Sequence, residues 1–229
     1  MSQTQSLKIS IIVSAIMLST PVPAKTIADY RHTIFVQADQ QPLVFQAPDG
    51  GCFLDQTADT EKVLYSTFQE KVERSQRKKL LAVFTDCSAL NDIEGNVSAE
   101  GKDNIIMNSG VILWTKPETK ISWKTNREIY LNHTAPSFIS YTQQGIKNKD
   151  ANDLDEDFYQ NNNGLYVGIS TAHNSLYSNE KSSAVFAKTL IKKSPIEIFV
   201  RNSDYKSKSQ EEVYNEIDRF VALQIQLNE

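Results

Sequence analysis

Several residue types that would indicate a chemical activity are scarce in this sequence. The 229 residues include two cysteines, three histidines and eight glycines. The glycines do not cluster into a phosphate-binding loop, and His32, His133 and His173 are too scattered for the zinc-binding H-E-x-x-H pattern. A G-x-S-x-G nucleophile motif begins at Gly168 but is broken by Ala172. The sequence therefore predicts no catalytic residue, no metal site and no cofactor.

An excess of basic charge is also missing. There are 24 Lys and Arg residues against 28 Asp and Glu residues, and the formal net charge is -4. A protein that binds nucleic acid through phosphate contacts needs a basic patch or stripe, so nucleic acid is not an expected partner. The apolar content of 40% is enough to fill a core, which argues against disorder.

Apolar runs long enough to cross a membrane are absent as well. The N-terminal residues 1–24 place Lys8 before an apolar stretch at 9–18 and end in the small residues of Val22-Pro23-Ala24, which is typical of a secretory signal peptide. The stretch is about half of the roughly 20 apolar residues that a membrane-spanning helix needs. We therefore expect cleavage after Ala24, a periplasmic or secreted location in a bacterium, and no membrane span in the mature chain.

The mature chain, residues 25–229, reads as one α+β domain. It has no internal repeat and no linker rich in Pro, Gly or Ser. The first two and the last two strand-like segments are spaced as hairpins, but the pattern leaves the strand order open. These segments are 33–37, 43–45, 80–84, 104–115, 165–170, 184–191 and 196–201. Segment 104–115 is either two short strands or one strand with a bulge at Gly110.

The two cysteines, Cys52 and Cys87, are predicted to form a disulfide, because an even count in an exported chain favours pairing. Two buried free thiols are the alternative. Each cysteine follows an apolar run, at 43–45 and 80–84, and a helix lies between them. A Pro-Asp-Gly-Gly turn is predicted at 48–51, just before Cys52. Because a disulfide needs Cα atoms within about 7 Å, we expect the two strands to run in the same direction, as in a β-α-β crossover. The continuous run at 80–84 predicts a strand that is buried on both faces.

Two helices are predicted in the first two thirds of the chain. The first spans about 58–74, with Thr57 as its capping residue. The second begins at a capping box of Thr125 and Glu128 and continues to about residue 146. Pro136 either kinks this helix or divides it into two.

A third helix is predicted at the C-terminus. It begins at a capping box formed by Ser209 and Glu212. Its apolar residues recur at helical spacing and are expected to be buried; they are Val213, Ile217, Phe220, Val221 and Ile225.

The segment 147–164 is unusually acidic and invites comparison with a calcium loop. An EF-hand needs glycine at position 6 and glutamate at position 12 of its loop. When the loop is started at Asp153, Phe158 and Gly164 occupy these two places, so calcium is not expected. We interpret the segment as a solvated acidic loop that ends in an Asn-rich turn and can contact a partner. The contact residues predicted here are Asp150, Asp153, Asp155, Glu156 and Asp157.

Three stretches, GGCFLD at 50–55, LLAVFTDC at 80–87 and IDRFVALQIQLN at 217–228, together with the order of the elements, give a resemblance to PsbP/Mog1-like domains of exported bacterial proteins. The resemblance spans most of the mature chain but includes no diagnostic motif. It implies a central, mostly antiparallel sheet with helices packed on its faces, and a role in binding other proteins rather than in catalysis. No functional residue carries over from it.

The leading hypothesis is an exported, non-catalytic protein that binds a protein partner in the cell envelope, for example as an inhibitor or immunity-type protein. An envelope hydrolase with a dispersed active site and a small-ligand carrier are the alternatives. A groove lined by aromatic residues would favour binding. A pocket with a serine or carboxylate beside a histidine would favour the enzyme.

Overall fold

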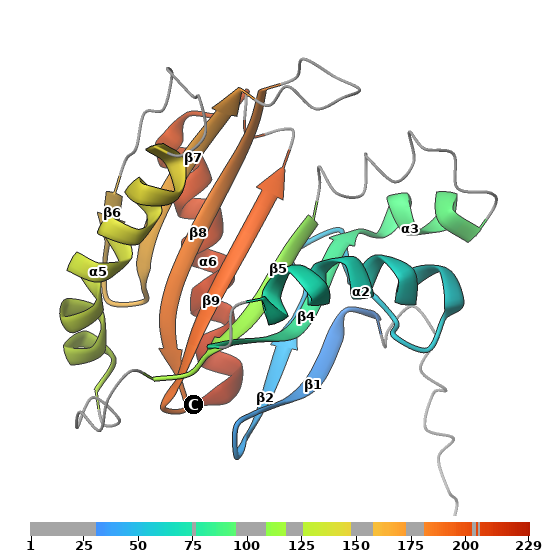
Figure 1. Ribbon diagram of the computed structural model, residues 1–229, viewed down its shortest axis with the longest axis horizontal. Coiled ribbons are helices and arrows are strands. Elements are labelled where there is room, and N and C mark those ends of the chain that lie inside the picture. The colour runs from blue at the N-terminus through green and yellow to red at the C-terminus, as the bar shows by residue number, and fades with distance from the viewer. Residues whose placement is uncertain are drawn as a thin grey trace, which may run out of the picture.

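The computed structural model describes residues 31–74, 77–94, 109–117, 126–147, 158–172, 181–202, 205 and 207–229. Nine strands and four helices lie in these ranges, which confirms the α+β prediction (Figure 1). In chain order they are β1 (Thr33–Ala38), β2 (Gln41–Gln46), β3 (Gly51–Phe53), α2 (Asp59–Glu73), β4 (Lys78–Asp86), α3 (Cys87–Glu94), β5 (Ser109–Thr115), α5 (Arg127–Lys147), β6 (Phe158–Gln160), β7 (Leu165–Ala172), β8 (Lys181–Ile191), β9 (Ser194–Asn202) and α6 (Gln210–Asn228).

The strands form two sheets in which every pairing is antiparallel. A seven-stranded sheet has the order β3-β4-β5-β9-β8-β7-β6, and β1 and β2 form a separate hairpin. Both predicted hairpins, β1–β2 and β8–β9, are confirmed. The second closes through Lys192 and Lys193, which both have positive φ, as a two-residue type I′ turn requires.

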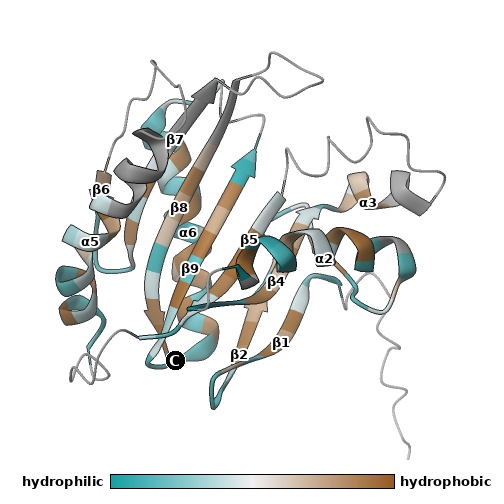
Figure 2. Ribbon diagram, viewed as in Figure 1, coloured by the Kyte–Doolittle hydropathy of each residue, from teal (hydrophilic) through white to brown (hydrophobic). Residues whose placement is uncertain are grey.

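Helices cover both faces of the large sheet. In Figure 1, α6 lies behind the sheet, whereas α2 and α5 lie in front of it. Strand register agrees, because Ile198 packs in the cluster that contains α6 residues, while its chain neighbour Phe199 packs against the α2 cluster. Figure 2 shows the corresponding brown, apolar bands along β4, β5, β8 and β9.

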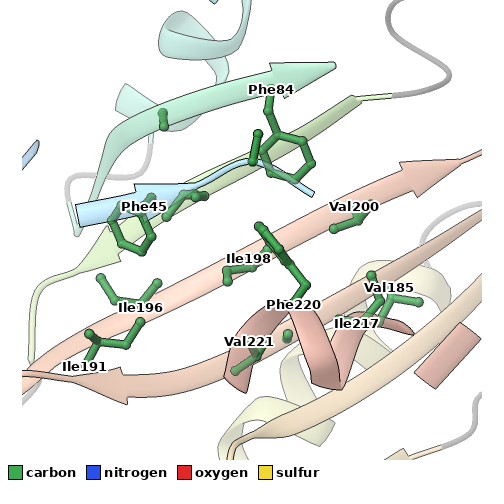
Figure 3. Packing of buried hydrophobic residues seen from close by; sticks show 14 of the residues in the cluster. Phe45, Phe84, Val185, Ile191, Ile196, Ile198, Val200, Ile217, Phe220 and Val221 are labelled. Atoms are coloured by element: carbon green, nitrogen blue, oxygen red, sulfur yellow. The ribbon is translucent and has the colours of Figure 1, made fainter. Parts of the chain in front are cut away.

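The main core lies between the sheet and α6. Figure 3 shows Ile198 and Val200 of β9 facing Phe220 of α6, with Phe84 of β4 and Phe45 of β2 beside them. The predicted C-terminal helix is confirmed, including its apolar stripe and its capping box. The Ser209 side chain accepts a hydrogen bond from the Glu212 backbone, and the Glu212 carboxylate accepts one from the Ser209 backbone.

The free edge of β2 is closed by side-chain amides of α6. Asn228 Oδ1 accepts from the Val44 amide and Asn228 Nδ2 donates to the Val44 carbonyl, at 2.9 and 2.7 Å. Gln224 makes the same pair of bonds to Gln46, at 2.9 and 3.1 Å. Two helix side chains four residues apart can reach two strand residues two apart, because four helical residues rise about 6 Å, close to the span of two strand residues. Two side chains thus replace a neighbouring strand.

The predicted β-α-β crossover is wrong. Cys52 does not end the strand that precedes it but lies within β3, which pairs antiparallel with β4 and places Cys52 opposite Thr85. The reason is the turn at 48–51, where Gly51 N donates to the Pro48 carbonyl at 2.8 Å and Gly50 has a φ of 75°. A turn with positive φ at its third residue reverses the chain, so a new strand begins at Gly51.

The predicted start of one helix needs correction, and that of another lies partly outside the described residues. α2 spans Asp59–Glu73, but its N-cap is Ala58 and no side chain caps it. Thr57 instead donates its hydroxyl and amide hydrogens to Asp55 Oδ1, at 2.6 and 2.8 Å. At α5, Asn126 Oδ1 accepts from the Glu128 amide at 2.8 Å, and Thr125 lies outside the described residues.

One alternative left open by the sequence is resolved. α5 is one continuous helix from Arg127 to Lys147, with Pro136 inside it. The strand predicted at 104–115 is β5 from Ser109 onward, and the part before Ser109 lies outside the described residues. The β4–β5 register shift lies in β4, between Leu80 and Ala82, and not at Gly110.

Candidate functional site

The predicted acidic contact residues, Asp150, Asp153, Asp155, Glu156 and Asp157, lie outside the described residues, so the contact patch stays a prediction. The described chain resumes immediately after them at β6, a short strand that the sequence analysis did not expect. No helix in the described part of the chain is both long and apolar enough to span a membrane.

The predicted Asn-rich turn follows β6 and is tied to α6. Asn161 Oδ1 accepts from the amides of Asn163 and Gly164 within the turn. Asn161 and Asn163 also donate their side-chain amides to Asp218 Oδ1, at 2.8 and 3.0 Å. Tyr166 donates its hydroxyl to the same oxygen at 2.6 Å. Through these bonds the polar side chains of the turn and Tyr166 hold the β6–β7 hairpin against α6.

The predicted disulfide between Cys52 and Cys87 is confirmed, with a Cα–Cα distance of 4.9 Å. It joins β3 to the first residue of α3, across the end of β4. His32, just before β1, lies next to the bridge and donates from Nδ1 to the Gly51 carbonyl at 2.8 Å. His32, Cys52 and Cys87 form the group of potential metal ligands found among the described residues.

A cleft of about 490 Å³ opens beside this bridge, and we call it the α6 cleft. Its walls are the turn at 47–51, the C-terminal ends of β4 and β9, Tyr205, and one side of α6. Ligand pockets in proteins commonly occupy 300 to about 1,000 Å³. The lining residues are 47–51, 84–86, 200–202, Tyr205, Glu216, Ile217, Arg219, Phe220 and Leu223.

The floor of the α6 cleft is apolar and aromatic. The rings of Phe84 and Phe220 contact each other with centroids 5.5 Å apart, and Val200 and Ile217 flank them in the same core cluster (Figure 3). The Phe84 ring occupies the space above Gly110, where an added Cβ would lie 2.1 Å from Cζ of the ring. Glycine at this position of β5 is therefore required for the floor to form.

The rim of the α6 cleft carries both signs of charge. Asp86 Oδ1 accepts from the backbone amide and hydroxyl of Ser88, which anchors the start of α3. Burial raises the pKa of the Tyr205 hydroxyl, and the neighbouring Glu216 carboxylate, its hydrogen-bond partner, raises it further. Arg219, which is exposed, extends over the α6 side of the rim. The phenol of Tyr205 thus stays protonated and hydrogen-bonded to Glu216.

A second polar cluster is buried on the opposite face of the sheet. Glu197 of β9 pairs with Lys78 of β4 at 2.7 Å and with Lys188 of β8 at 3.2 Å. Burial alone would raise the pKa of the Glu197 carboxyl, but the two lysines outweigh it and lower that pKa. Burial and the charge of Glu197 raise the pKa of Tyr130 in α5. On this face of β9, Glu197 is only 8% exposed, whereas Phe199 is half-buried.

Comparison with known proteins gives no relative. No protein-family model matches the chain, and no curated protein or solved structure matches it either. The resemblance to PsbP/Mog1-like domains therefore stays a prediction, and the function is argued from the chain itself.

The sequence analysis did not find the α6 cleft, although it named several of its parts. It identified the turn at 48–51 and the apolar stripe of α6 that contains Ile217 and Phe220. These two segments are far apart in the chain, and no local pattern indicates that they face each other. The one available signal was Gly110 within an apolar strand, because such a glycine often marks close approach of another group.

Proposed function

We propose that this protein is an exported, non-catalytic binding protein of the bacterial cell envelope, and that the α6 cleft holds a segment of a protein partner. The observation that carries this proposal is the lining of the cleft. Phe84, Tyr205 and Phe220 line the cleft with rings that are largely buried, and the lining residues that the structure describes include neither histidine nor serine. Aromatic anchor sites with a polar rim are typical of protein interfaces.

The chemistry of the cleft suits a peptide segment. An apolar partner side chain can pack on the half-buried Leu223, beside the largely buried rings of Phe84 and Phe220, while backbone polar groups of the segment meet the rim. The rim offers Asp49 as an acceptor and Arg219 as a cation, while the Tyr205 hydroxyl is already hydrogen-bonded to Glu216. The acidic segment at 150–157 is proposed to steer a basic partner toward the protein, which speeds association more than it tightens binding.

Two features support the exported location. The N-terminal residues 1–24 have the pattern of a signal peptide. The Cys52–Cys87 disulfide is compatible with an oxidising compartment, in which such bonds persist. Because the protein is proposed to be exported, we place its partner in the cell envelope as well.

Site-specific photo-crosslinking tests this proposal. Leu223, half-buried at the cleft, is replaced by p-benzoylphenylalanine in cells that export the full chain. The matched control carries the same substitution at Val63 of α2, an apolar residue that is 61% exposed and does not line the cleft. Illumination should give a discrete, higher-mass adduct at Leu223 only. Absence of an adduct at Leu223, or the same adduct at both positions, would contradict the proposal.

A small-ligand carrier is the second candidate, and the cleft volume of about 490 Å³ favours it. This volume matches a small organic molecule as well as one or two amino-acid side chains. Native mass spectrometry of protein purified from the periplasm separates the two. A stoichiometric small-molecule adduct that disappears in a Leu223→Arg variant would favour the carrier over the protein partner.

A further inference from the structure

Three metal-binding side chains meet at the disulfide. A ring nitrogen of His32 and the sulfur atoms of Cys52 and Cys87 all lie within 4.8 Å of one another. Cys52 is buried, and the other two residues are half-buried. Imidazole and thiolate are the ligands that select Cu(I) and Zn(II) over harder ions. In the bridged protein the sulfurs are bonded to each other, so they become thiolate ligands only after reduction.

Backbone hydrogen bonds hold the three residues together independently of the S–S bond. The Cys87 amide donates to the Gly50 carbonyl at 2.9 Å. The Ala47 amide donates to the His32 carbonyl at 2.8 Å, which fixes the chain of His32 against the same turn. Cys52 is paired with Thr85 in the β3–β4 ladder. Reduction therefore removes one covalent bond but leaves these contacts in place.

The hydrogen bond from His32 also sets the form of its ring. A carbonyl oxygen only accepts, so the 2.8 Å contact between His32 Nδ1 and the Gly51 carbonyl requires the proton on Nδ1. In the neutral ring, Nε2 then carries the lone pair. Metal-binding histidines are commonly oriented in this way, with the second ring nitrogen donating to a backbone carbonyl.

We propose that reduction of the Cys52–Cys87 bond creates a binding site for Cu(I), with both sulfurs and His32 Nε2 as ligands. A dithiol reductant supplies two electrons and two protons, and is itself oxidised to a disulfide, while Cys52 and Cys87 become thiols. Binding of Cu(I) then displaces the two thiol protons to solvent, and the oxidation state of the metal does not change. The bridged and metal-bound states exclude each other.

The number and softness of the ligands favour Cu(I) over Zn(II). Structural zinc sites are almost always four-coordinate. Cu(I) is stable with three soft ligands, and three are what the described residues bring together here. Ligands bound to one ion at 2.0 to about 2.3 Å lie up to roughly 4 Å apart, so only a small opening of the two sulfurs is needed.

Competition with bicinchoninate, a coloured Cu(I) chelator, tests the site in the mature chain under anaerobic conditions. Reduced wild-type protein, freed of reductant, should remove one Cu(I) per chain from the chelator, and the bridged protein should remove none. The key variant is His32→Asn, because an asparagine amide can still donate to the Gly51 carbonyl but lacks Nε2. Its Cu(I) affinity should fall by about tenfold or more. His133→Asn, an exposed histidine on α5, should bind as wild type does.

Far-ultraviolet circular dichroism of the reduced protein accompanies the titration. The proposal is overturned if reduced wild type takes no Cu(I) from the chelator, or if His32→Asn takes it equally well. Loss of the native spectrum on reduction also overturns it, because the ligand set exists only in the folded chain. Tighter binding of Zn(II) than of Cu(I), measured with a zinc-sensitive dye, would overturn the choice of metal.

Discussion

The two faces of the seven-stranded sheet are covered in different ways. On one face, α6 and the β1–β2 hairpin close over a single continuous apolar cluster that includes Phe45, Ile198 and Phe220. On the other face, α2 and α5 cover two separate clusters, represented by Val83 under α2 and Leu165 under α5. We call these the α6 face and the α2/α5 face.

Strand register shows what separates the two clusters of the α2/α5 face. A row across five strands reads Leu80, Leu113, Glu197, Lys188 and Leu165, so the charged pair lies between apolar neighbours. On the α6 face one long helix and a hairpin cover a continuous apolar cluster, whereas on the other face two helices leave a seam between them. Charge is tolerated in that seam because it is paired.

The largest effect is expected on the α6 face. Phe220→Ala should lower the free energy of unfolding by about 4 kcal/mol, because it removes a buried ring and leaves a cavity beside Phe84. Urea denaturation followed by circular dichroism measures the change. Leu227→Ala is the control on the same helix, since Leu227 is 41% exposed, and it should cost less than about 0.5 kcal/mol. Equal losses in both variants would mean that α6 does not seal the core.

The seam of the α2/α5 face should respond next. Glu197→Gln leaves the ammonium groups of Lys78 and Lys188 without their carboxylate and should cost about 3 kcal/mol. Glu70→Gln on the exposed side of α2 is the control and should cost less than about 0.5 kcal/mol. Combined replacement of the three charged residues by Leu or Met should recover most of the loss. If the triple variant were as unstable as Glu197→Gln, the ion pairs would have to stabilise the fold beyond offsetting the cost of their own burial.

The same cluster predicts a pH dependence. The folded protein lowers the pKa of Glu197 from its ordinary value of 4.5, so the unfolded chain binds the proton more readily. The stabilisation is complete above pH 4.5 and is lost as the pH falls through the folded-state value. Wild type should therefore lose more stability than the apolar triple variant between neutral and acidic pH, as measured by urea denaturation at a series of pH values.

The smallest effect is expected at the edge of the β1–β2 hairpin. Gln224→Ala removes both side-chain bonds to Gln46 and should cost about 2 kcal/mol, because buried backbone groups lose their partners. Hydrogen exchange should accelerate at the Gln46 amide and stay slow at the Val44 amide, which is held by Asn228. Gln226→Ala, exposed on the same helix, should change neither quantity. An unchanged Gln46 exchange rate in Gln224→Ala would contradict the role of this amide.

The errors of the sequence analysis occur where a local pattern is compatible with two different structures. Thr57 is a residue type that commonly caps helices. Its hydroxyl and amide groups donate to the Asp55 carboxylate instead, because this nearer acceptor competes for them. Glu197 alternates with apolar residues as a solvated position would, but its pairing with Lys78 and Lys188 makes its burial tolerable. The direction of β3 depended on whether the turn at Gly50 reverses the chain or merely bends it.

Sequence alone determined the features that arise from neighbouring residues. These are the capped, striped helix at 210–228, the two hairpins, the buried strand β4 and the pairing of the only two cysteines. Period, capping and turn chemistry act over a few residues, so they can be read directly from the chain. Tertiary structure decided the strand order, the α6 cleft, the paired charges around Glu197 and the contact of His32 with the disulfide. Each of these joins segments separated by many residues, and what places them together is the packing of the whole sheet.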